Sequence, residues 1–308
     1  MIIFILSYGV SHAQETTLFA AATDDCQDGP ATESTLYTVN PLNGNSNEVG
    51  PIEFEGVGFR GVTGLAFLGD GRLVGSAQAD VGFGDGIIRR AILIEINPLT
   101  GQAFEIGVIG DNNTPDECGR APDLTYDPVT DTLFASGKQC TGFGSGPIFL
   151  MRINQTTGQG TQIGNTGEQG SGNGLAIRDD SVLFWTESDP ALYTLNPVTG
   201  LATEVTPLSG NFSTLGAMAF HPVTGVLFAS NLNPPEPFGG DEALLQTVNT
   251  TTGLLTTIGQ LPDCTDALIF SPSRVTNVPT LSEWGLIALA TILGIVGFMV
   301  IRRRKVAA

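Results

Sequence analysis

The sequence predicts an all-β fold: a five-bladed β-propeller closed by the N- and C-terminal strands in one blade, followed by a single C-terminal transmembrane helix. Three observations indicate the propeller. A turn motif returns five times, 40 Gly and 18 Pro residues accompany few aromatic residues, and a strand missing from the first repeat is present after the last. Short strands joined by tight turns have this composition. The predicted propeller domain spans residues 15–274.

The repeated turn begins with Asn and ends with Gly. Its copies read Asn-Pro-Leu-Asn-Gly, Asn-Pro-Leu-Thr-Gly, Asn-Gln-Thr-Thr-Gly, Asn-Pro-Val-Thr-Gly and Asn-Thr-Thr-Thr-Gly, and they start at Asn40, Asn97, Asn154, Asn196 and Asn249. Asn starts the reversal, Pro presets φ, and Gly takes the positive φ that returns the chain. The starts are 57, 57, 42 and 53 positions apart, a blade period that resembles those of kelch and NHL propellers.

Four strands of about four to six residues are predicted in each repeat. A hairpin precedes the turn, as in residues 65–67 with 73–76, and the strand after it ends in a motif such as Glu105-Ile106-Gly107. The first repeat begins at residues 18–21, which align with the second strand of the others. Its missing opening strand is predicted at residues 267–270. Ring closure by these two strands would leave no exposed sheet edge.

Four cysteines predict two disulfides in an oxidising compartment. Cys26 and Cys140 follow second strands, and Cys118 and Cys264 precede first strands. These places share one face of a propeller, so we expect the pairs Cys118–Cys140 and Cys26–Cys264. Free thiols are the alternative.

The same face is expected to carry long acidic loops, at residues 22–35, 77–91, 108–122, 137–147 and 231–243. Carboxylates in Gly-rich loops suit Ca²⁺. The candidate ligands are Asp24, Asp25 and Asp28, which precede Gly29 as in a calcium loop, although Cys26 replaces an oxygen ligand. Solvated acidic loops are the alternative.

No catalytic constellation is recognised in the sequence. The only histidine outside the N-terminal segment is His221, which lies in a Pro-containing turn and is expected to be structural. Four of the 13 basic residues lie near the C-terminus, which leaves nine against a total of 31 carboxylates in the chain. So acidic a body excludes nucleic acid as a partner.

The C-terminal segment predicts a membrane anchor. Residues 284–301 carry no charge and would form about 27 Å of helix, enough for a bilayer core of about 30 Å. Basic residues follow as a stop-transfer signal that places the C-terminus in the cytoplasm and the body outside: Arg302, Arg303, Arg304 and Lys305. The transmembrane helix and basic tail are placed at residues 285–308. A buried soluble helix is the alternative.

Before the helix lies a motif within a linker at residues 275–284. Its residues are Val278, Pro279, Thr280, Leu281, Ser282, Glu283 and Trp284. Motif, apolar helix and basic run together resemble the IPTL-CTERM protein-sorting domain, with Val278 in place of the usual Ile. The resemblance implies recognition by an exosortase-type membrane enzyme of a Gram-negative bacterium, with cleavage near the motif.

The other end resembles a secretory signal. Residues 2–6 are apolar, small residues follow near Ala13, and a polar segment starts at Glu15. A signal peptide is predicted at residues 1–14, and a first β-strand is the alternative.

These features predict an exported cell-envelope or surface protein. Its propeller would act as a binding module for a protein or glycan ligand, anchored in the membrane or released by cleavage. The second hypothesis is a calcium-dependent propeller enzyme that hydrolyses lactones or glycans. The third is a structural matrix component.

Overall fold

The computed structural model describes residues 16–23, 33–83, 86–109, 123–138, 147–169, 173–187, 190–232, 242–273 and 291. Residues Thr16–Ser273 form one compact unit. The predicted signal peptide, linker and sorting motif lie outside the described residues, as does the predicted membrane helix apart from Thr291. Within the described part of the chain, no helix is both long enough and apolar enough to cross a membrane.

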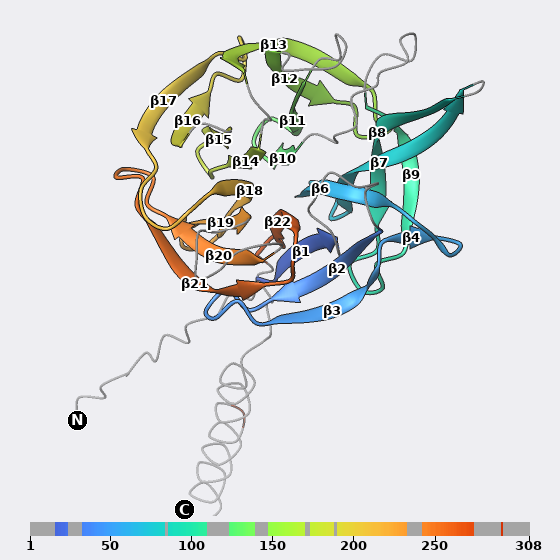
Figure 1. Ribbon diagram of the computed structural model, residues 1–308, viewed down its shortest axis with the longest axis horizontal. Coiled ribbons are helices and arrows are strands. Elements are labelled where there is room, and N and C mark those ends of the chain that lie inside the picture. The colour runs from blue at the N-terminus through green and yellow to red at the C-terminus, as the bar shows by residue number, and fades with distance from the viewer. Residues whose placement is uncertain are drawn as a thin grey trace, which may run out of the picture. The chain divides into compact units, whose positions relative to one another are not determined.

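Five four-stranded antiparallel sheets form the blades of a ring, as the sequence predicts (Figure 1). The first blade contains β22 (Thr265–Phe270), β1 (Leu18–Thr23), β2 (Ser34–Val39) and β3 (Ser46–Pro51). The second contains β6 (Arg60–Phe67), β7 (Leu73–Phe83), β8 (Gly86–Ile96) and β9 (Ala103–Val108). The third contains β10 (Asp123–Asp127), β11 (Thr132–Lys138), β12 (Pro147–Ile153) and β13 (Gly160–Gln169).

The remaining two blades follow the same order from the centre of the ring outward. The fourth contains β14 (Asn173–Ile177), β15 (Leu183–Thr186), β16 (Ala191–Leu195) and β17 (Ala202–Pro207). The fifth contains β18 (Thr214–Phe220), β19 (Leu227–Leu232), β20 (Ala243–Val248) and β21 (Leu255–Leu261). Figure 1 shows the first strand of each blade near the centre and the fourth along the circumference.

The last described strand closes the ring. In the first blade β22 pairs antiparallel with β1, with Leu18 opposite Phe270 and Ala21 opposite Ala267. The segment at residues 267–270 therefore supplies the opening strand that the first repeat lacks, which confirms the predicted closure. With β22 paired to β1, the first blade has four strands like the other four blades.

The predicted turns also form. Gly44, Gly101, Gly158, Gly200 and Gly253 all have φ between 68° and 80°. The Asn that begins each turn caps it: the side-chain oxygen of Asn154, for example, accepts hydrogen bonds from the backbone N–H groups of Thr156 and Thr157 at 2.9 and 3.0 Å. The Asn and Gly positions are explained by local hydrogen bonding and backbone conformation.

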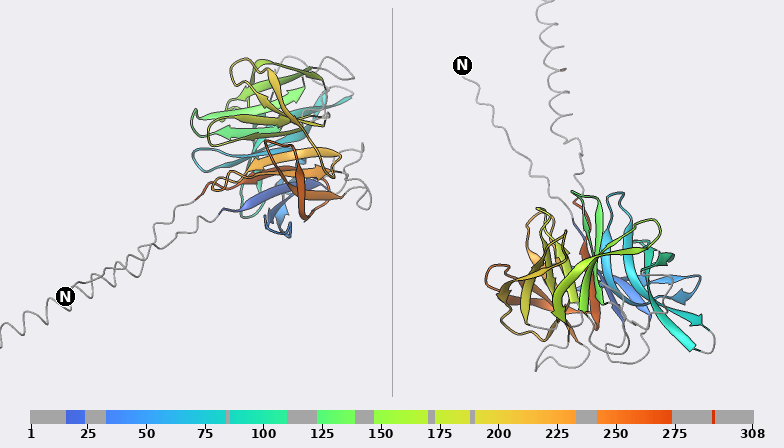
Figure 2. Two further views of the ribbon diagram at one scale, coloured as in Figure 1. Left: turned by 90° about the vertical axis from the view of Figure 1, so that its left-hand side faces the viewer. Right: turned by 90° about the horizontal axis from the view of Figure 1, so that it is seen from above.

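Two elements differ from the sequence prediction. Strands β7 and β8 each have 11 residues, so most of the loop expected at residues 77–91 is strand, and this hairpin extends outward from the ring (Figure 2). Strand β8 is rich in Ile, which favours continued pairing from Leu73–Ile96 to Phe83–Gly86. A further hairpin, β4 (Glu53–Phe54) with β5 (Val57–Gly58), lies between the first and second blades and was not predicted.

The core consists of apolar clusters between neighbouring blades. One of them joins Phe134 and Leu150 of the third blade to Leu175 and Trp185 of the fourth. Another joins Leu18 of the first blade to residues of the fifth, including Leu245. Burying one such side chain contributes about 1.5–3 kcal/mol, so the stability of the ring depends on every blade interface, including the closing one.

Backbone contacts between blades supplement these clusters. The α-carbon of Gly107 in β9 lies against the turn of the next blade, so that an added β-carbon would come 2.2 Å from the carbonyl oxygen of Thr157. Gly164 in β13 lies against Thr199 in the same way, at 2.0 Å. The recurring glycine of the fourth strands is thus required by close packing on the next blade.

Candidate functional site

The sequence predicts a functional site at the end of the ring opposite the repeated turns. The strand pairing places Asp123 and Ser136 at this end of the third blade, and Asp127 and Thr132 at the turn end. The strands that flank residues 24–32, 110–122, 139–146 and 233–241 end or begin at the end that carries Asp123 and Ser136. We call this end the loop face. Of the predicted loop at residues 77–91, the described residues belong to strands β7 and β8.

The candidate calcium ligands Asp24, Asp25 and Asp28 lie outside the described residues, so the predicted calcium site remains a prediction. Within the described ranges, no group of three or more His, Cys, Asp or Glu side chains could hold a metal ion. The structure therefore brings together no alternative metal centre among the side chains it places.

One predicted cysteine is described. Cys264 is buried at the loop face, immediately before β22, and it is disulfide-bonded. Cys26, Cys118 and Cys140 lie outside the described residues. The pairing Cys26–Cys264 and the pairing Cys118–Cys140 therefore both remain predictions.

At the centre of the ring the structure shows a polar feature that the sequence analysis missed. Asp123, Thr125 and Asp127 occupy alternate positions of the inner strand β10, and all three are buried. Alternate residues of a strand lie on the same face. Their side chains bind the next blade at three levels, from the loop face towards the turns.

The hydrogen bonds run to strand β14 and to the turn that follows it. Asp123 accepts the backbone N–H of Leu175, and Thr125 Oγ1 accepts that of Ile177 at 3.1 Å. Asp127 Oδ1 accepts the hydroxyl of Ser181 at 3.0 Å. We call these three residues the polar seam. Asp123 and Thr125 satisfy backbone N–H groups that β14 presents to its neighbour, and Asp127 binds the side chain of the following turn.

At the position of Thr125, the middle residue of the polar seam, the other blades use apolar residues. Those that the strand register aligns with Thr125 are Ala66, Ala176, Ala219 and Ile269. Thr125 was therefore detectable as a polar residue where four repeats carry apolar ones, whereas polar residues equivalent to Asp127 occur in other blades as well, as at Arg178 and His221.

Burial dominates the electrostatics of Asp123. It raises the pKa of this carboxyl well above its ordinary value, and the charge of Asp266 in β22 adds to the increase. The backbone N–H groups of Leu175 and Leu124 act in the opposite direction, because they stabilise the ionised form. Its hydrogen bonds to two backbone groups give Asp123 a role in joining blades rather than in activating a nucleophile.

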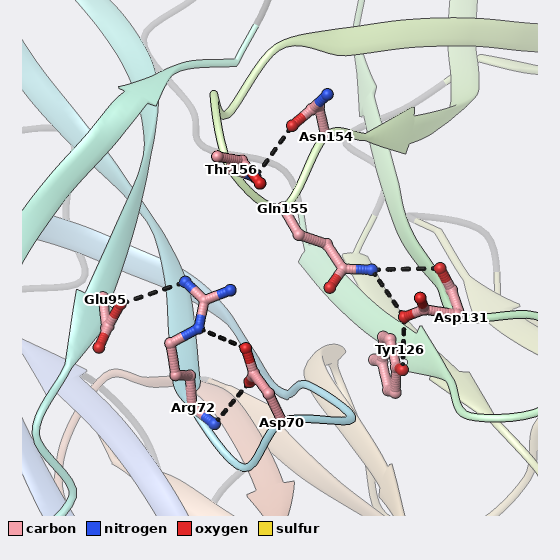
Figure 3. Close-up of polar contacts among 8 residues, drawn as sticks. All are labelled: Asp70, Arg72, Glu95, Tyr126, Asp131, Asn154, Gln155 and Thr156. Carbon is pink, nitrogen blue, oxygen red and sulfur yellow. Dashed lines mark hydrogen bonds and ion pairs between the residues drawn. The ribbon is translucent and has the colours of Figure 1, made fainter.

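Polar clusters at the turn end of the ring, which we call the turn face, also join strands (Figure 3). Arg72 Nε donates to Asp70 at 2.7 Å, and Arg72 Nη1 donates to Glu95 at 3.2 Å. The hydrogen bond from Arg72 lowers the pKa of the Asp70 carboxyl. These charges are largely exposed, so each pair contributes little to stability.

A second turn-face cluster lies in the third blade (Figure 3). The Tyr126 hydroxyl donates to Asp131 at 2.8 Å, and the Gln155 amide donates to the carbonyl and carboxylate oxygens of Asp131, both at 3.1 Å. Burial raises the pKa of Tyr126, and the bond to Asp131 adds to the increase. Asp131 has φ of 53°, and these bonds fix the turn in that conformation.

His221 is placed as a structural residue. Its Nδ1 accepts the backbone N–H groups of Val223 and Thr224 at 3.2 and 3.3 Å, the role that Asn plays in the repeated turns. Its Nε2 lies 3.3 Å from the hydroxyl of Thr16, and its ring packs on Phe270 at 4.8 Å. With Nδ1 accepting, Nε2 carries the proton and donates to Thr16.

Comparisons with known proteins concern the tail and the fold separately. Residues 276–305 match the IPTL-CTERM motif. The match contains all the predicted sorting residues, from Val278 to Trp284, and all four terminal basic residues. No curated protein matches the chain.

The solved structures that resemble the chain are distant. A Bacteroides thetaiotaomicron protein of unknown function is 14% identical over 64% of this chain, with a TM-score of 0.42, and this chain covers only 51% of its length. The periplasmic gluconolactonase PpgL of Pseudomonas aeruginosa is 14% identical over 85% of this chain and 87% of its own, with a TM-score of 0.43.

A gluconolactonase of Xanthomonas campestris, XC5397, is 12% identical over 76% of this chain and 74% of its own, with a TM-score of 0.45. Likenesses this distant say nothing about activity. The comparisons and the strand topology together describe a chain that carries an IPTL-CTERM motif at residues 276–305 behind a five-bladed β-propeller.

Proposed function

We propose that this chain is an exported protein of the cell envelope whose propeller is a binding module, sorted through its C-terminal tail by an exosortase-type enzyme. The match of residues 276–305 to the IPTL-CTERM motif carries the proposal. A sorting motif that follows a complete propeller by a few residues suits a folded body delivered to the cell surface.

The proposed layout follows from the charges and apolar segments. Residues 1–14 are a signal peptide, residues 15–274 the propeller, residues 275–284 the linker with the sorting motif, and residues 285–308 the membrane helix with its basic end. The positive-inside rule then puts the propeller outside the cytoplasm. Before cleavage the protein spans the membrane once, and after cleavage it is displayed on the surface or secreted.

Cysteine chemistry supports export. Cys264 is disulfide-bonded, and disulfides persist in oxidising compartments. We propose Cys26 as its partner, because residue 26 follows β1 and residue 264 precedes β22, and these two strands are paired. The remaining pair is Cys118 with Cys140.

The proposed ligand is a protein or a glycan, bound at the loop face. Loops that vary in length on a rigid ring are a common place for recognition residues. Among the described residues, the hydroxyl groups of the polar clusters, such as those of Ser181 and Tyr126, are hydrogen-bonded to carboxylates that join strands and turns. These observations favour binding over catalysis.

Processing tests the sorting part of the proposal. Mass spectrometry of the protein from its host should give a C-terminus between residues 278 and 285. The double variant Pro279→Ala/Glu283→Ala should retain an intact Ala308 and lose surface display. The control Ala307→Ser lies outside the matched residues and should be processed normally. An intact Ala308 in the unmodified protein would reject cleavage.

The calcium-dependent enzyme is the second candidate, motivated by the acidic composition. Chelation should then lower the Tm, and a panel of lactones and glycans should show turnover. Asp24→Asn/Asp25→Asn/Asp28→Asn should abolish both effects. A matched triple variant of exposed carboxylates, Glu48→Gln/Asp179→Asn/Glu204→Gln, should abolish neither. Ligand binding that persists in chelator without turnover would favour the binding module.

A further inference from the structure

The hairpin β4–β5 presents an exposed aromatic pair. Phe54 is 39% exposed and Phe104, in the adjacent strand β9, is 48% exposed. Their ring centroids are 5.3 Å apart with an interplanar angle of 60°, an edge-to-face contact. Among the large apolar side chains that are exposed in the described part of the chain, these two are the aromatic ones. An aromatic pair left in solvent is a candidate contact surface.

Val57 extends this surface. It is 72% exposed and pairs with Phe54 across the two strands of the hairpin, which places both side chains on one face. We call Phe54, Val57 and Phe104 the hairpin patch. The four-stranded blades are complete without β4 and β5, so the repeat architecture does not require this insertion.

The base of the hairpin is held firmly between two blades. Ile52 is fully buried, and its N–H donates to the carbonyl of Ser34 at 2.8 Å. The N–H of Phe59 donates to the carbonyl of Ile52 at 2.8 Å. Glu53 forms a bridge with Gln102 of the second blade. A fixed base limits the conformational entropy lost on binding.

The tip of the hairpin carries a residue that the turn itself does not favour. Glu55 and Gly56 have φ of 51° and 81°, as in a two-residue turn that usually carries Asn-Gly. Glutamate at the first position costs backbone energy that Asn would avoid. Its side chain is exposed and adds a negative charge to the tip next to Phe54.

Charge identifies the kind of partner. Glu55 follows Phe54 at the exposed tip, and Glu95, which also accepts a hydrogen bond from Arg72, lies opposite Phe104 and therefore on the same face of the sheet. Residues 52–59 and 103–108 contain no Lys or Arg. Cations are attracted both to carboxylates and to the faces of aromatic rings. Phe also lacks the hydroxyl or indole N–H with which Tyr and Trp bind sugars. The patch therefore complements a cationic apolar surface better than a neutral glycan.

We propose that the hairpin patch binds a basic peptide segment in which an aliphatic or aromatic side chain is flanked by Lys or Arg. The apolar side chain packs on Phe54, Val57 and Phe104, and the basic residues pair with the exposed carboxylates of Glu55 and Glu95. This inference rests on the proposed role of the propeller as a binding module and names the chemistry of one partner.

The test measures binding of a fluorescent synthetic peptide of alternating Lys and Leu or Phe to the full chain in detergent micelles. Anisotropy at physiological ionic strength gives the affinity. Phe54→Ser/Phe104→Ser should weaken binding by about tenfold or more, as expected for central aromatic contacts. The control Leu42→Ser/Val198→Ser changes two exposed apolar residues on distant turns and should bind as the unmodified protein does.

A second variant separates charge from folding. Glu55→Asn removes one carboxylate and suits the backbone of the turn, so it should keep or raise the Tm. Because residue 55 lies at the rim of the patch, the affinity for the peptide should fall by about threefold. The control Glu204→Gln removes an exposed charge elsewhere and should leave the affinity unchanged.

Equal affinity of the unmodified protein and Phe54→Ser/Phe104→Ser would overturn the proposal, because binding would then follow net charge alone. So would patch-dependent binding of a neutral cello-oligosaccharide in the absence of peptide binding. Failure here, together with correct processing and a ligand at the loop face, would reject only the patch. Peptide binding by a protein that stays in the cytoplasm would reject only the proposed sorting.

Discussion

The α-carbon of Gly259 lies against the backbone carbonyl of Asn43, so closely that a β-carbon at residue 259 would come 1.9 Å from the Asn43 oxygen. Gly259 is in the fourth strand of the last blade, and Asn43 is in the repeated turn of the first. The ring is therefore closed twice, near its centre by the β1–β22 pairing and near its circumference by this contact.

Replacing Gly259 with Ala should destabilise the propeller. The residue does not have the positive φ that would make Ala strained by itself, so the cost comes from the overlap with Asn43. We expect the free energy of unfolding to fall by about 2–4 kcal/mol, in the upper range for overpacking, because the obstacle is backbone. Urea denaturation measures the change.

Gly71→Ala serves as the control. Gly71 has φ of 90° and open space around its α-carbon, so its substitution strains only the local backbone, at a cost of about 1–2 kcal/mol. If Gly259→Ala cost no more than Gly71→Ala, the outer contact would not contribute to closure.

The polar seam predicts a cost for Thr125→Val, which preserves shape but removes the acceptor of the Ile177 N–H. A buried donor left without a partner costs about 1–3 kcal/mol. The exposed turn residue Thr156 offers a matched control, because Thr156→Val removes a hydroxyl that faces solvent. Equal stabilities of the two variants would mean that water replaces the Thr125 hydroxyl.

Asp123 predicts a pH-dependent contribution to stability. Because the pKa of Asp123 is raised in the folded protein, the folded protein binds the proton more tightly than the unfolded chain does. The resulting stabilisation is present below the ordinary pKa of 3.8 and is lost as the pH rises through the higher folded pKa. Above that range the buried carboxylate is a cost.

Asp123→Asn removes this titration and keeps an oxygen acceptor. The stability of Asp123→Asn relative to the unmodified protein should therefore increase from pH 4 upward, with a slope of at most about 1.4 kcal/mol per pH unit. Urea denaturation at a series of pH values measures this difference, in which the effects of the other carboxylates largely cancel. A constant or decreasing difference would contradict the assignment.

His221 should tolerate Asn better than Ala. Asn supplies an oxygen for the N–H groups of Val223 and Thr224, as in the repeated turns, and loses only the contacts with Thr16 and Phe270. We expect His221→Asn to cost less than about 1 kcal/mol and His221→Ala about 1–2 kcal/mol. Thermal denaturation compares the two, and equal losses would show that the turn does not need the acceptor.

Several elements could be predicted because their signals are local. The Asn and Gly of each turn lie four residues apart, and their hydrogen bonds and backbone angles depend on that segment alone. The closing strand at residues 267–270 was predicted because it completed a repeat pattern. The tail was predicted for a similar reason, since motif, apolar run and basic end are contiguous.

Other elements could not be predicted because their causes are distant in the chain. Strand β7 extends to Phe83 because β8 pairs with it throughout, whereas the Gly-rich composition suggested a loop. The hairpin β4–β5 does not belong to the repeat, so no other copy reveals it. Among the candidate site residues, Asp24, Asp25 and Asp28 remain predictions, and Asp123 was missed.

The sequence by itself determined the number and order of the blades, because turn chemistry and strand periodicity act between near neighbours. It also determined the way the ring closes, because the last segment completes the strand pattern of the first repeat. Only the tertiary structure decided which residues meet across blades: Gly259 with Asn43, Thr125 with Ile177, and Phe54 with Phe104. These contacts join segments up to about two hundred residues apart, and their energies depend on the curvature of the whole ring, which no local pattern encodes.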